Sequence, residues 1–330
     1  MIIRSTLSRA RNQFALACGG QCASSTAAAF DAEIGHRYCE EVQNLLSKIF
    51  PTPTRNSQFQ LDDETYTRRA LAAAHLLSTH FGMDDLVWNH ISARLPPAAS
   101  KMVSESEAGS GLGPSFLITR GNSLFDEVSP SSLVRGSVAD NVTGDVIHGA
   151  IYSSRPDVRA IVHSHTIPIT AVSAVKDGLQ FLSQDSARFF ERLAAHTYGG
   201  VSTGEGSGQE DEEDERQAIG AAMSTEVAPG AGLPIALLME QHGATTVGRT
   251  VEEAWVRMYY LDVCCRVQLA AGQAAACGGG GVRQIEPDKL RFARAQFDAD
   301  FADGRFEWPA LLQRLVALRA SGQPIARQLR

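Results

Sequence analysis

The sequence predicts an α/β layered domain. Two short apolar runs, residues 159–162 and 234–240, have the length and the continuous apolar character of strands that are buried on both faces. Residues 144–154 and 250–272 have helical patterns instead, with apolar side chains gathered on one face of the first segment. Because strands and helices alternate along the chain, these elements are expected to pack as layers.

The first helix predicted by the sequence covers residues 61–83. Asp62 and Asp63 suit its N-terminus, where a carboxylate meets the positive end of the helix dipole, and Gly82 suits its end. A strand is expected directly after it, over residues 86–95.

Polar insertions separate the elements that follow. Residues 96–115 are rich in glycine and serine and predict a flexible loop, which leads into a short buried strand at 116–119 and a turn at 120–128. Residues 199–217 are glycine-rich and then strongly acidic, so a solvated surface loop is expected there. The acidic run is a poor candidate for a metal site, because nothing in the pattern fixes its geometry.

The C-terminal part of the chain is predicted to be helical. The long helix begins with Thr250 and Glu253, which have the spacing of a capping box. Residues 274–281 have the composition of a hinge or linker. Two amphipathic segments near 286–300 and 308–320 are expected to fold back on the core or on a neighbouring subunit.

Composition narrows the class of function. The 330 residues are 44% hydrophobic and carry a net charge of −7, which argues against nucleic acid as the main partner. No apolar run approaches the roughly 20 residues that a membrane-spanning helix needs. The six cysteines form no CxxC pair and are interpreted as reduced thiols.

The N-terminal stretch differs from the rest of the chain. Residues 1–30 contain Arg4, Arg9 and Arg11, contain no acidic residue, and are rich in serine, threonine and alanine. This composition is typical of a mitochondrial transit peptide, and an extension without a targeting role is the alternative.

Two histidines follow the buried run at 159–162. Side chains alternate across a strand, so His163 and His165 are expected to face the same side, with Ser164 on the opposite side. Two such imidazoles can share a metal ion, and His242, which also follows a buried strand and precedes Gly243, is the natural third ligand. Three imidazoles suit zinc, iron or a related divalent ion, whereas hydrogen-bonded histidines without a metal are the alternative.

Three longer segments resemble the class II aldolase/adducin family. They are "FLITRGNSLFDEVSPSSLV", "HGAIYSSRPDVRAIVHSHT" and "QHGATTVGRTVEEAW", and they occur in the family's order. The stretches "WNHISARL", "FLSQDSARFFERLAAHTYGGV" and "MYYLDVCCRVQLAAG" are most similar to its adducin-related branch. The resemblance divides the chain into an extension (1–56), the class II aldolase/adducin domain (57–275) and a linker with a helical tail (276–330).

The resemblance implies a three-layer α/β/α fold with a central, largely antiparallel sheet. It also implies a divalent metal on His163, His165 and His242, with zinc the first expectation and Fe(II) the second. In the family's aldolases this ion polarises the carbonyl of a small phosphorylated or carboxylated, sugar-like substrate. The substrate-binding positions carried over to this sequence are Asn89, Thr119, Asn122 and Thr143.

Two departures from the aldolase pattern concern proton transfer. The family's acid/base glutamate lies four residues before the helix histidine, and here that position, counted back from His148, is Gly144. Asp145 is the adjacent acid, although it also suits the helix dipole. The stretch "LQFLSQDSARFF" contains no tyrosine where the aldolases have a catalytic one. The remaining catalytic candidates are Asp145, His148, which could instead cap a carbonyl, and His196.

Two classes of function therefore stay open. The first is a metal-dependent lyase, decarboxylase or oxygenase that acts on a small oxygenated acid or sugar phosphate. The second is a non-catalytic, adducin-like protein that binds actin filaments. The resemblance also implies a homo-oligomer, a tetramer in related proteins. The composition of the N-terminal stretch predicts a mitochondrial location, with a cytoplasmic one as the alternative, which is cytoskeletal under the adducin interpretation.

Overall fold

The structure is a computed structural model that describes residues 37–51, 63–95, 115–136, 141–197, 199–200, 209–300, 304–322 and 325. The expected transit peptide, residues 1–30, lies outside the described residues. Within the described ranges, no helix combines the length and the apolar character that crossing a bilayer requires.

A single sheet of seven strands forms the centre of the described part of the chain, in the order β3-β2-β1-β4-β7-β6-β5. Its strands are β1 (His90–Arg94), β2 (Phe116–Ile118), β3 (Val134–Arg135), β4 (Ala160–Ser164), β5 (Leu193–His196), β6 (Ala236–Met239) and β7 (Gly243–Gly248). All neighbouring strands pair antiparallel except β5 and β6, which are parallel. The sheet is thus largely antiparallel, as the family resemblance predicts.

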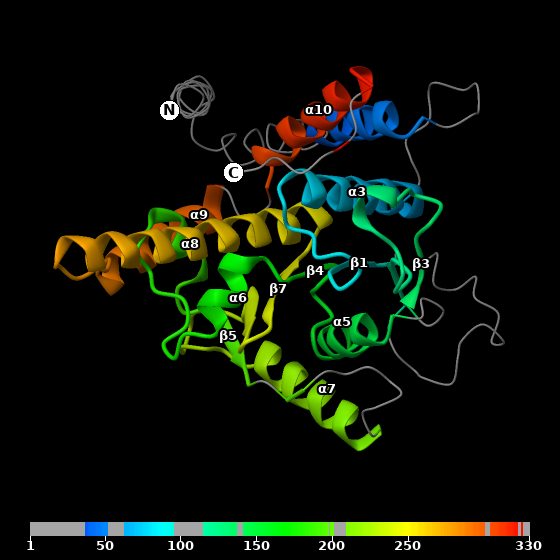
Figure 1. Cartoon of the computed structure of the whole chain (residues 1–330). Coiled ribbons are helices and arrows are strands. Elements are labelled where there is room, and N and C mark those ends of the chain that lie inside the picture. Colours follow the sequence, from blue (N-terminus) through cyan, green and yellow to red (C-terminus); the bar gives the residue numbers. More distant parts are fainter. Residues whose placement is uncertain are drawn as a thin grey trace, which may run out of the picture.

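Helices cover both faces of the sheet (Figure 1). The longer ones are α3 (Asp63–His80), α5 (Val142–Ser154), α7 (Gln209–Ser224), α8 (Val251–Gly278), α9 (Pro287–Asp300) and α10 (Glu307–Ala320). Shorter ones are α6 (Ile167–Ser173) and the 3-10 helices η1 (Phe125–Glu127) and η3 (Gln184–Phe189). Helices α3 and α8 lie on one face and α5 and α7 on the other, which confirms the three-layer α/β/α architecture (Figure 1).

Because side chains alternate along a strand, β4 contributes to the hydrophobic clusters on both faces of the sheet. Ala160 and Val162 belong to the hydrophobic cluster with α3 and α8, whereas Ile161 belongs to the cluster with α5 and α7. His163 lies two residues after Ile161 and therefore faces the α5 and α7 side of the sheet. Ser164 faces away, and its hydroxyl donates to the carbonyl oxygen of Met83.

The chain on either side of the expected domain also contributes to the core. A helix over residues 37–49 places Val42 and Leu46 in the same buried cluster as Trp308 and Leu312 of α10. Figure 1 shows α10 beside this helix, both packed above α3. The residues that the sequence assigns to an extension and a tail thus include two helices that bury part of the same apolar surface.

The acidic segment at 209–224 is a helix, α7, and the predicted surface loop was wrong there. Carboxylates in its first turns favour the positive end of the helix dipole. Ile219 and Met223 are four residues apart, so they share one face and are fully buried against α5. The tertiary contact of this short apolar face outweighs the loop-like composition of the segment.

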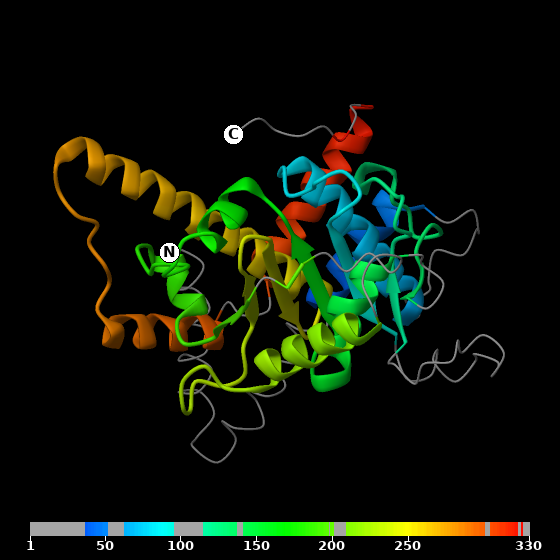
Figure 2. The same ribbon diagram turned by 60° about the horizontal axis from the view of Figure 1, so that its bottom comes forward.

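Helix α8 is longer than the sequence predicts. Thr250 caps it by accepting from the Glu253 N–H at 3.2 Å, as expected, whereas the Glu253 carboxylate accepts from the Arg249 N–H instead of completing the capping box. The helix continues through the expected hinge to Gly278, and Gly279 ends it with φ of 67°. Figure 2 shows the C-terminal end of α8 extending beyond the sheet.

His75 makes stability pH-dependent. It is fully buried in α3, it donates to the carbonyl oxygen of Leu71 at 2.7 Å, and burial lowers its pKa to about 4. The unfolded chain takes up this proton near pH 6.5, so the unfolding free energy falls as pH falls from 6.5 towards 4. At pH 5.5 the expected loss from this histidine is about 1.4 kcal/mol.

His75→Gln tests this pH dependence. Urea unfolding of the variant between pH 7 and 5.5 is expected to show a decline smaller by about that amount than in the wild type. Equal declines in both proteins would contradict the assignment.

Candidate metal centre

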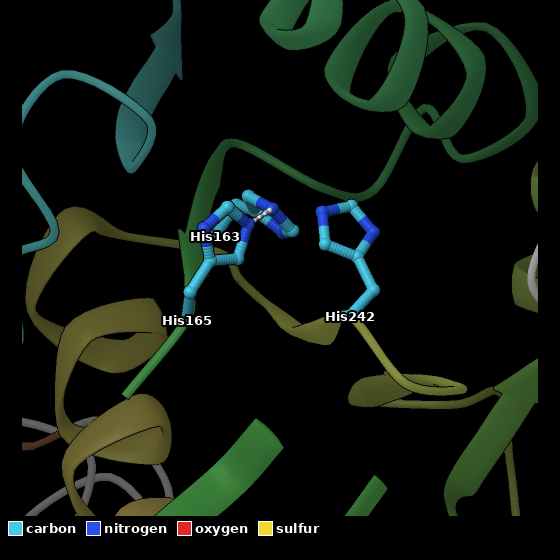
Figure 3. Close-up of side chains that lie close together, drawn as sticks. All are labelled: His163, His165 and His242. Atoms are coloured by element: carbon cyan, nitrogen blue, oxygen red, sulfur yellow. Dashed lines mark hydrogen bonds between the residues drawn. The ribbon is translucent and has the colours of Figure 1, made fainter. Parts of the chain in front are cut away.

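Three histidines meet at one end of the central strands (Figure 3). His163 lies in β4, His165 directly follows that strand, and His242 lies in the turn between β6 and β7. One ring nitrogen from each residue can be chosen so that all three lie within 4.8 Å of one another. In Figure 3, His242 approaches the other two rings from the opposite side.

Hydrogen bonds at Nδ1 orient the rings of the first pair. Nδ1 of His163 is 3.0 Å from the hydroxyl of Thr245, and Nδ1 of His165 is 3.4 Å from the carboxylate of Asp85. If each Nδ1 carries the proton that it donates, both Nε2 atoms carry lone pairs. These Nε2 atoms face each other at 2.7 Å, an arrangement that is stable only when a cation or a proton lies between them.

Backbone geometry brings the third histidine close. Gln241, before His242, has φ of 57°, and the Gln241 N–H donates to the carbonyl oxygen of Ser173. A Cβ on Gly243 would lie 2.6 Å from the carbonyl oxygen of Ser164 and 2.8 Å from Cδ2 of His165. Only glycine permits this approach, as the sequence predicts for this position.

Burial keeps the three imidazoles neutral. It lowers the pKa of His163 well below its usual value, and the neighbouring histidines add to that effect. Burial lowers the pKa of His242 to about 4 and also lowers the pKa of His165, with Asp85 opposing the shift at the latter. Neutral imidazole is the form that binds metals, so the site is electrostatically prepared for a cation.

The donor set fits a divalent ion. Two nitrogens bound at about 2.0–2.1 Å to one ion are about 2.9–3.4 Å apart at angles of 90–109°. The 2.7 Å between the Nε2 atoms of His163 and His165 is close to that range. The three nitrogens spread over up to 4.8 Å, whereas two ligands of one ion are at most about 4.2 Å apart, so the rings must close slightly around a bound ion. Thr245 and Asp85 supply the supporting hydrogen bonds that usually orient ligating histidines.

The three histidines open into a cavity of about 360 Å³. Its wall consists of Asp85, Trp88, His90, Thr143, Ile147, His163, His165, Gly200, Glu215 and His242. This volume is at the small end of the range for ligand pockets, which is about 300–1,000 Å³. The wall combines apolar surface with a few ionisable groups, so the cavity can bind and orient a small polar molecule.

The predicted substrate-binding residues do not all reach this cavity. Thr143 lines it, at the start of α5. Asn89 is buried outside the cavity wall and supports the backbone of His165. Its Oδ1 accepts from the His165 N–H at 3.1 Å, and its Nδ2 donates to the Met83 carbonyl oxygen. Thr119 is 2% exposed and Asn122 is exposed, and neither belongs to the cavity wall.

His148 lies one layer behind the cavity. Its Nε2 is 2.8 Å from Nδ1 of His90, and its Nδ1 is 2.5 Å from the hydroxyl of Ser92, which in turn contacts the hydroxyl of Tyr152. Burial lowers its pKa to about 3. The ring of His90 stacks on that of His163 with centroids 4.7 Å apart, so His148 contacts the histidine cluster only through His90.

A side chain at position 144, where the family's aldolases have their glutamate, would require the side chains of Asn141 and Ile118 to shift. A Cβ on Gly144 would lie 2.8 Å from both Oδ1 of Asn141 and Cδ1 of Ile118. Asp145 does not replace it directly, because its carboxylate accepts from Arg216 of α7 at 2.8 Å and lies outside the cavity wall. The structure thus places Asp145 at the contact between α5 and α7.

Sequence reasoning missed several residues of the cavity wall, among them Asp85, Trp88, His90 and Glu215. His90 and Ser92 are two residues apart in a predicted strand, so both polar side chains face the same side of the sheet. That pattern could have identified His90 as a candidate. The carboxylate of Glu215 lies 3.7 Å from Nε2 of His196, which the sequence does single out.

Comparison with known proteins places this geometry in a family. Residues 69–269 match the family described as Class II Aldolase and Adducin N-terminal domain. A Caulobacter vibrioides protein assigned to aldolase class 2 is 31% identical over 232 residues, which are 66% of this chain and 78% of that protein. Alpha-adducin of Rattus norvegicus is 32% identical over 240 residues, which are 69% of this chain and 28% of the adducin.

Solved structures agree with the sequence matches. The structure of an aldolase II superfamily protein from Pseudomonas syringae is similar, with a TM-score of 0.62 and 28% identity, and covers 81% of this chain and 97% of its own. L-fuculose 1-phosphate aldolase from Glaciozyma antarctica has a TM-score of 0.59 at 21% identity, covers 86% of this chain and 99% of its own, and supports the fold alone. By both sequence and fold, the chain belongs to the class II aldolase and adducin N-terminal domain family.

Proposed function

We propose that the protein is a divalent-metal-dependent enzyme that carries out C–C bond chemistry, of lyase or decarboxylase type, on a small oxygenated acid or sugar phosphate. The observation that carries this proposal is the cluster of three neutral histidines at the base of a cavity of about 360 Å³. A structural histidine cluster would not need such an opening.

The wall of the cavity explains how a substrate would be oriented. Thr143 lies in the first turn of α5, so an anionic group of the substrate placed there would meet a hydroxyl and the positive end of the helix. Trp88 and Ile147 provide apolar surface for the carbon chain. A divalent ion on the histidines would supply a Lewis acid that polarises the substrate carbonyl.

The metal is expected to be zinc, with Fe(II) as the second candidate. Three imidazoles with open positions suit both ions. With Fe(II) bound, the same site would favour oxidative decarboxylation or oxygenation. Aldol cleavage by the family's usual route is less favoured, because Gly144 lacks the acid/base side chain that the family's aldolases have at this position.

Metal analysis followed by a substrate screen tests the proposal. The purified protein, reconstituted with Zn²⁺ or Fe²⁺, is expected to bind about one ion per chain and then to turn over a member of a panel of hydroxy acids, keto acids and sugar phosphates. Failure to retain either ion after reconstitution would refute the proposal.

A second candidate function is binding to actin filaments, as in an adducin-like protein. The similarity to alpha-adducin and the missing glutamate favour it. Co-sedimentation of the metal-loaded protein with actin filaments distinguishes the two: an enzyme without a cytoskeletal role stays in the supernatant.

Assembly into a homo-oligomer, a tetramer by family resemblance, is part of the same proposal. Leu86, Trp88 and Ile167 are 71%, 51% and 83% exposed and follow closely on Asp85 or His165 of the cavity in sequence. Exposed apolar side chains near a site are typical of subunit contacts.

A further inference from the structure

The cavity has a carboxylate on α7 that the family resemblance does not assign. Two carboxylates line it in the described residues, those of Asp85 and Glu215. Asp85 hydrogen-bonds Nδ1 of His165 and so serves to orient that histidine. The Glu215 side chain lines the same cavity and is 17% exposed, which leaves it accessible to a molecule in the cavity.

The next residue along α7 fixes the direction of Glu215. Arg216 donates to the Asp145 carboxylate at 2.8 Å and to the Asp145 carbonyl oxygen at 2.9 Å, which attaches this turn of α7 to the start of α5. Ile219 and Met223 bury the rest of the helix face. Because the helix is held at both places, the orientation of Glu215 towards the cavity is determined by the fold.

His196 is placed to support this carboxylate. It ends β5, and its Nε2 is 3.7 Å from Oε1 of Glu215. That Nε2 is buried and has no hydrogen-bond partner within the described residues, so a small movement of either side chain would bring it a first partner. A buried polar atom without a partner is destabilising, which favours such a movement.

We propose that Glu215 is the proton acceptor and donor of this site, in place of the side chain that Gly144 lacks, and that His196 positions it. This inference rests on the proposed metal-dependent function. In the step that it assigns, an O–H or C–H bond of the bound molecule breaks, the proton moves to an oxygen of Glu215, and the electron pair stays on the bound molecule. Return of the proton to the product restores the carboxylate.

Acetohydroxamate tests the proton transfer without knowledge of the substrate. It binds divalent ions through its oxygens as the deprotonated anion, so binding must deliver one proton either to the protein or to the buffer. Calorimetric titration of the Zn²⁺-loaded protein at pH 6.5, in two buffers of different ionisation enthalpy, counts the protons released. The wild type is expected to release close to none, because Glu215 takes up the proton.

Matched variants assign the effect to one residue. Glu215→Gln, and Glu215→Ala as a second variant, are each expected to release about one proton more per acetohydroxamate than the wild type. Glu213→Gln is the control, because Glu213 is exposed on the same helix, accepts from Gln217 and does not belong to the cavity wall as far as the structure describes it. It should match the wild type.

The zinc content of the wild type and of the Glu215 variant distinguishes the remaining outcomes of the experiment. Glu215→Gln is expected to keep the zinc content of the wild type, and a loss of zinc would show that Glu215 is a ligand and would overturn the inference. Equal proton counts in wild type and Glu215→Gln would also overturn it, while leaving the proposed function intact. Absence of zinc from the wild type itself would refute the proposed function and this inference together.

Discussion

His163→Ala is expected to reduce bound metal from about one ion per chain to near zero. His163 is 1% exposed, stands between the other two ligand candidates and His90, and has its Nδ1 oriented by Thr245. With it removed, two imidazoles remain, one protein ligand fewer than the three that catalytic zinc sites use. Zinc at about 100 times its dissociation constant should raise the unfolding free energy of the wild type by about 2.7 kcal/mol and leave the variant unchanged.

Metal content by elemental analysis and urea unfolding with and without Zn²⁺ provide the two measurements. His75→Gln is the matched control, because His75 is a buried histidine outside the cavity wall. It is expected to keep both the bound ion and the stabilisation by zinc. Retention of the ion by His163→Ala would show that the cluster is not the metal site.

Gly243→Ala is expected to damage the same site through the backbone. The added Cβ would lie 2.6 Å from the carbonyl oxygen of Ser164, so β7 and the end of β4 must separate locally. Such overpacking costs about 1–3 kcal/mol of stability. Because His165 and His242 flank the contact, metal affinity should also fall, by about tenfold or more.

Gly272→Ala provides the control for Gly243→Ala. Gly272 lies within α8, and a Cβ there would meet no atom within 4 Å. Replacing a helical glycine by alanine should raise the unfolding free energy by about 0.5–1 kcal/mol. Thermal unfolding and zinc titration of both variants would compare them directly, and a Gly243→Ala protein with wild-type zinc affinity would contradict the proposed role of the turn.

The pair of histidines at the end of β4 could be predicted from the sequence because strand alternation is a local property. Residues i and i+2 of a strand face the same side of the sheet, so the two histidines after the apolar run are expected to lie together. The structure brings the rings of His163 and His165 together. His242 required the further assumption that two strand ends meet, which a pattern alone does not establish. The family resemblance supplied that information, and the fold that it implied is confirmed.

The proposed acid/base residue could not be predicted in the same way. Asp145 lies at the start of a predicted helix, whereas Glu215 lies in a segment whose composition predicts a solvated loop, and only packing decides which of the two carboxylates faces the cavity. Arg216 pairs with Asp145, and that contact directs the adjacent Glu215 inwards. The pairing joins residues 71 positions apart, beyond the reach of any local pattern.

The pairing of the central strand has a consequence for how the protein folds. β4 pairs with β1 through His90 and His163, and with β7 through His163 and Thr245, so both neighbours are far away along the chain. A sheet built from such distant pairings has a high contact order and forms slowly, since long loops must close before any pairing contributes. During synthesis, β4 can pair with β7 only after the ribosome has released residues 243–248. A truncated product ending before residue 243 would leave this edge of β4 unpaired and prone to aggregation.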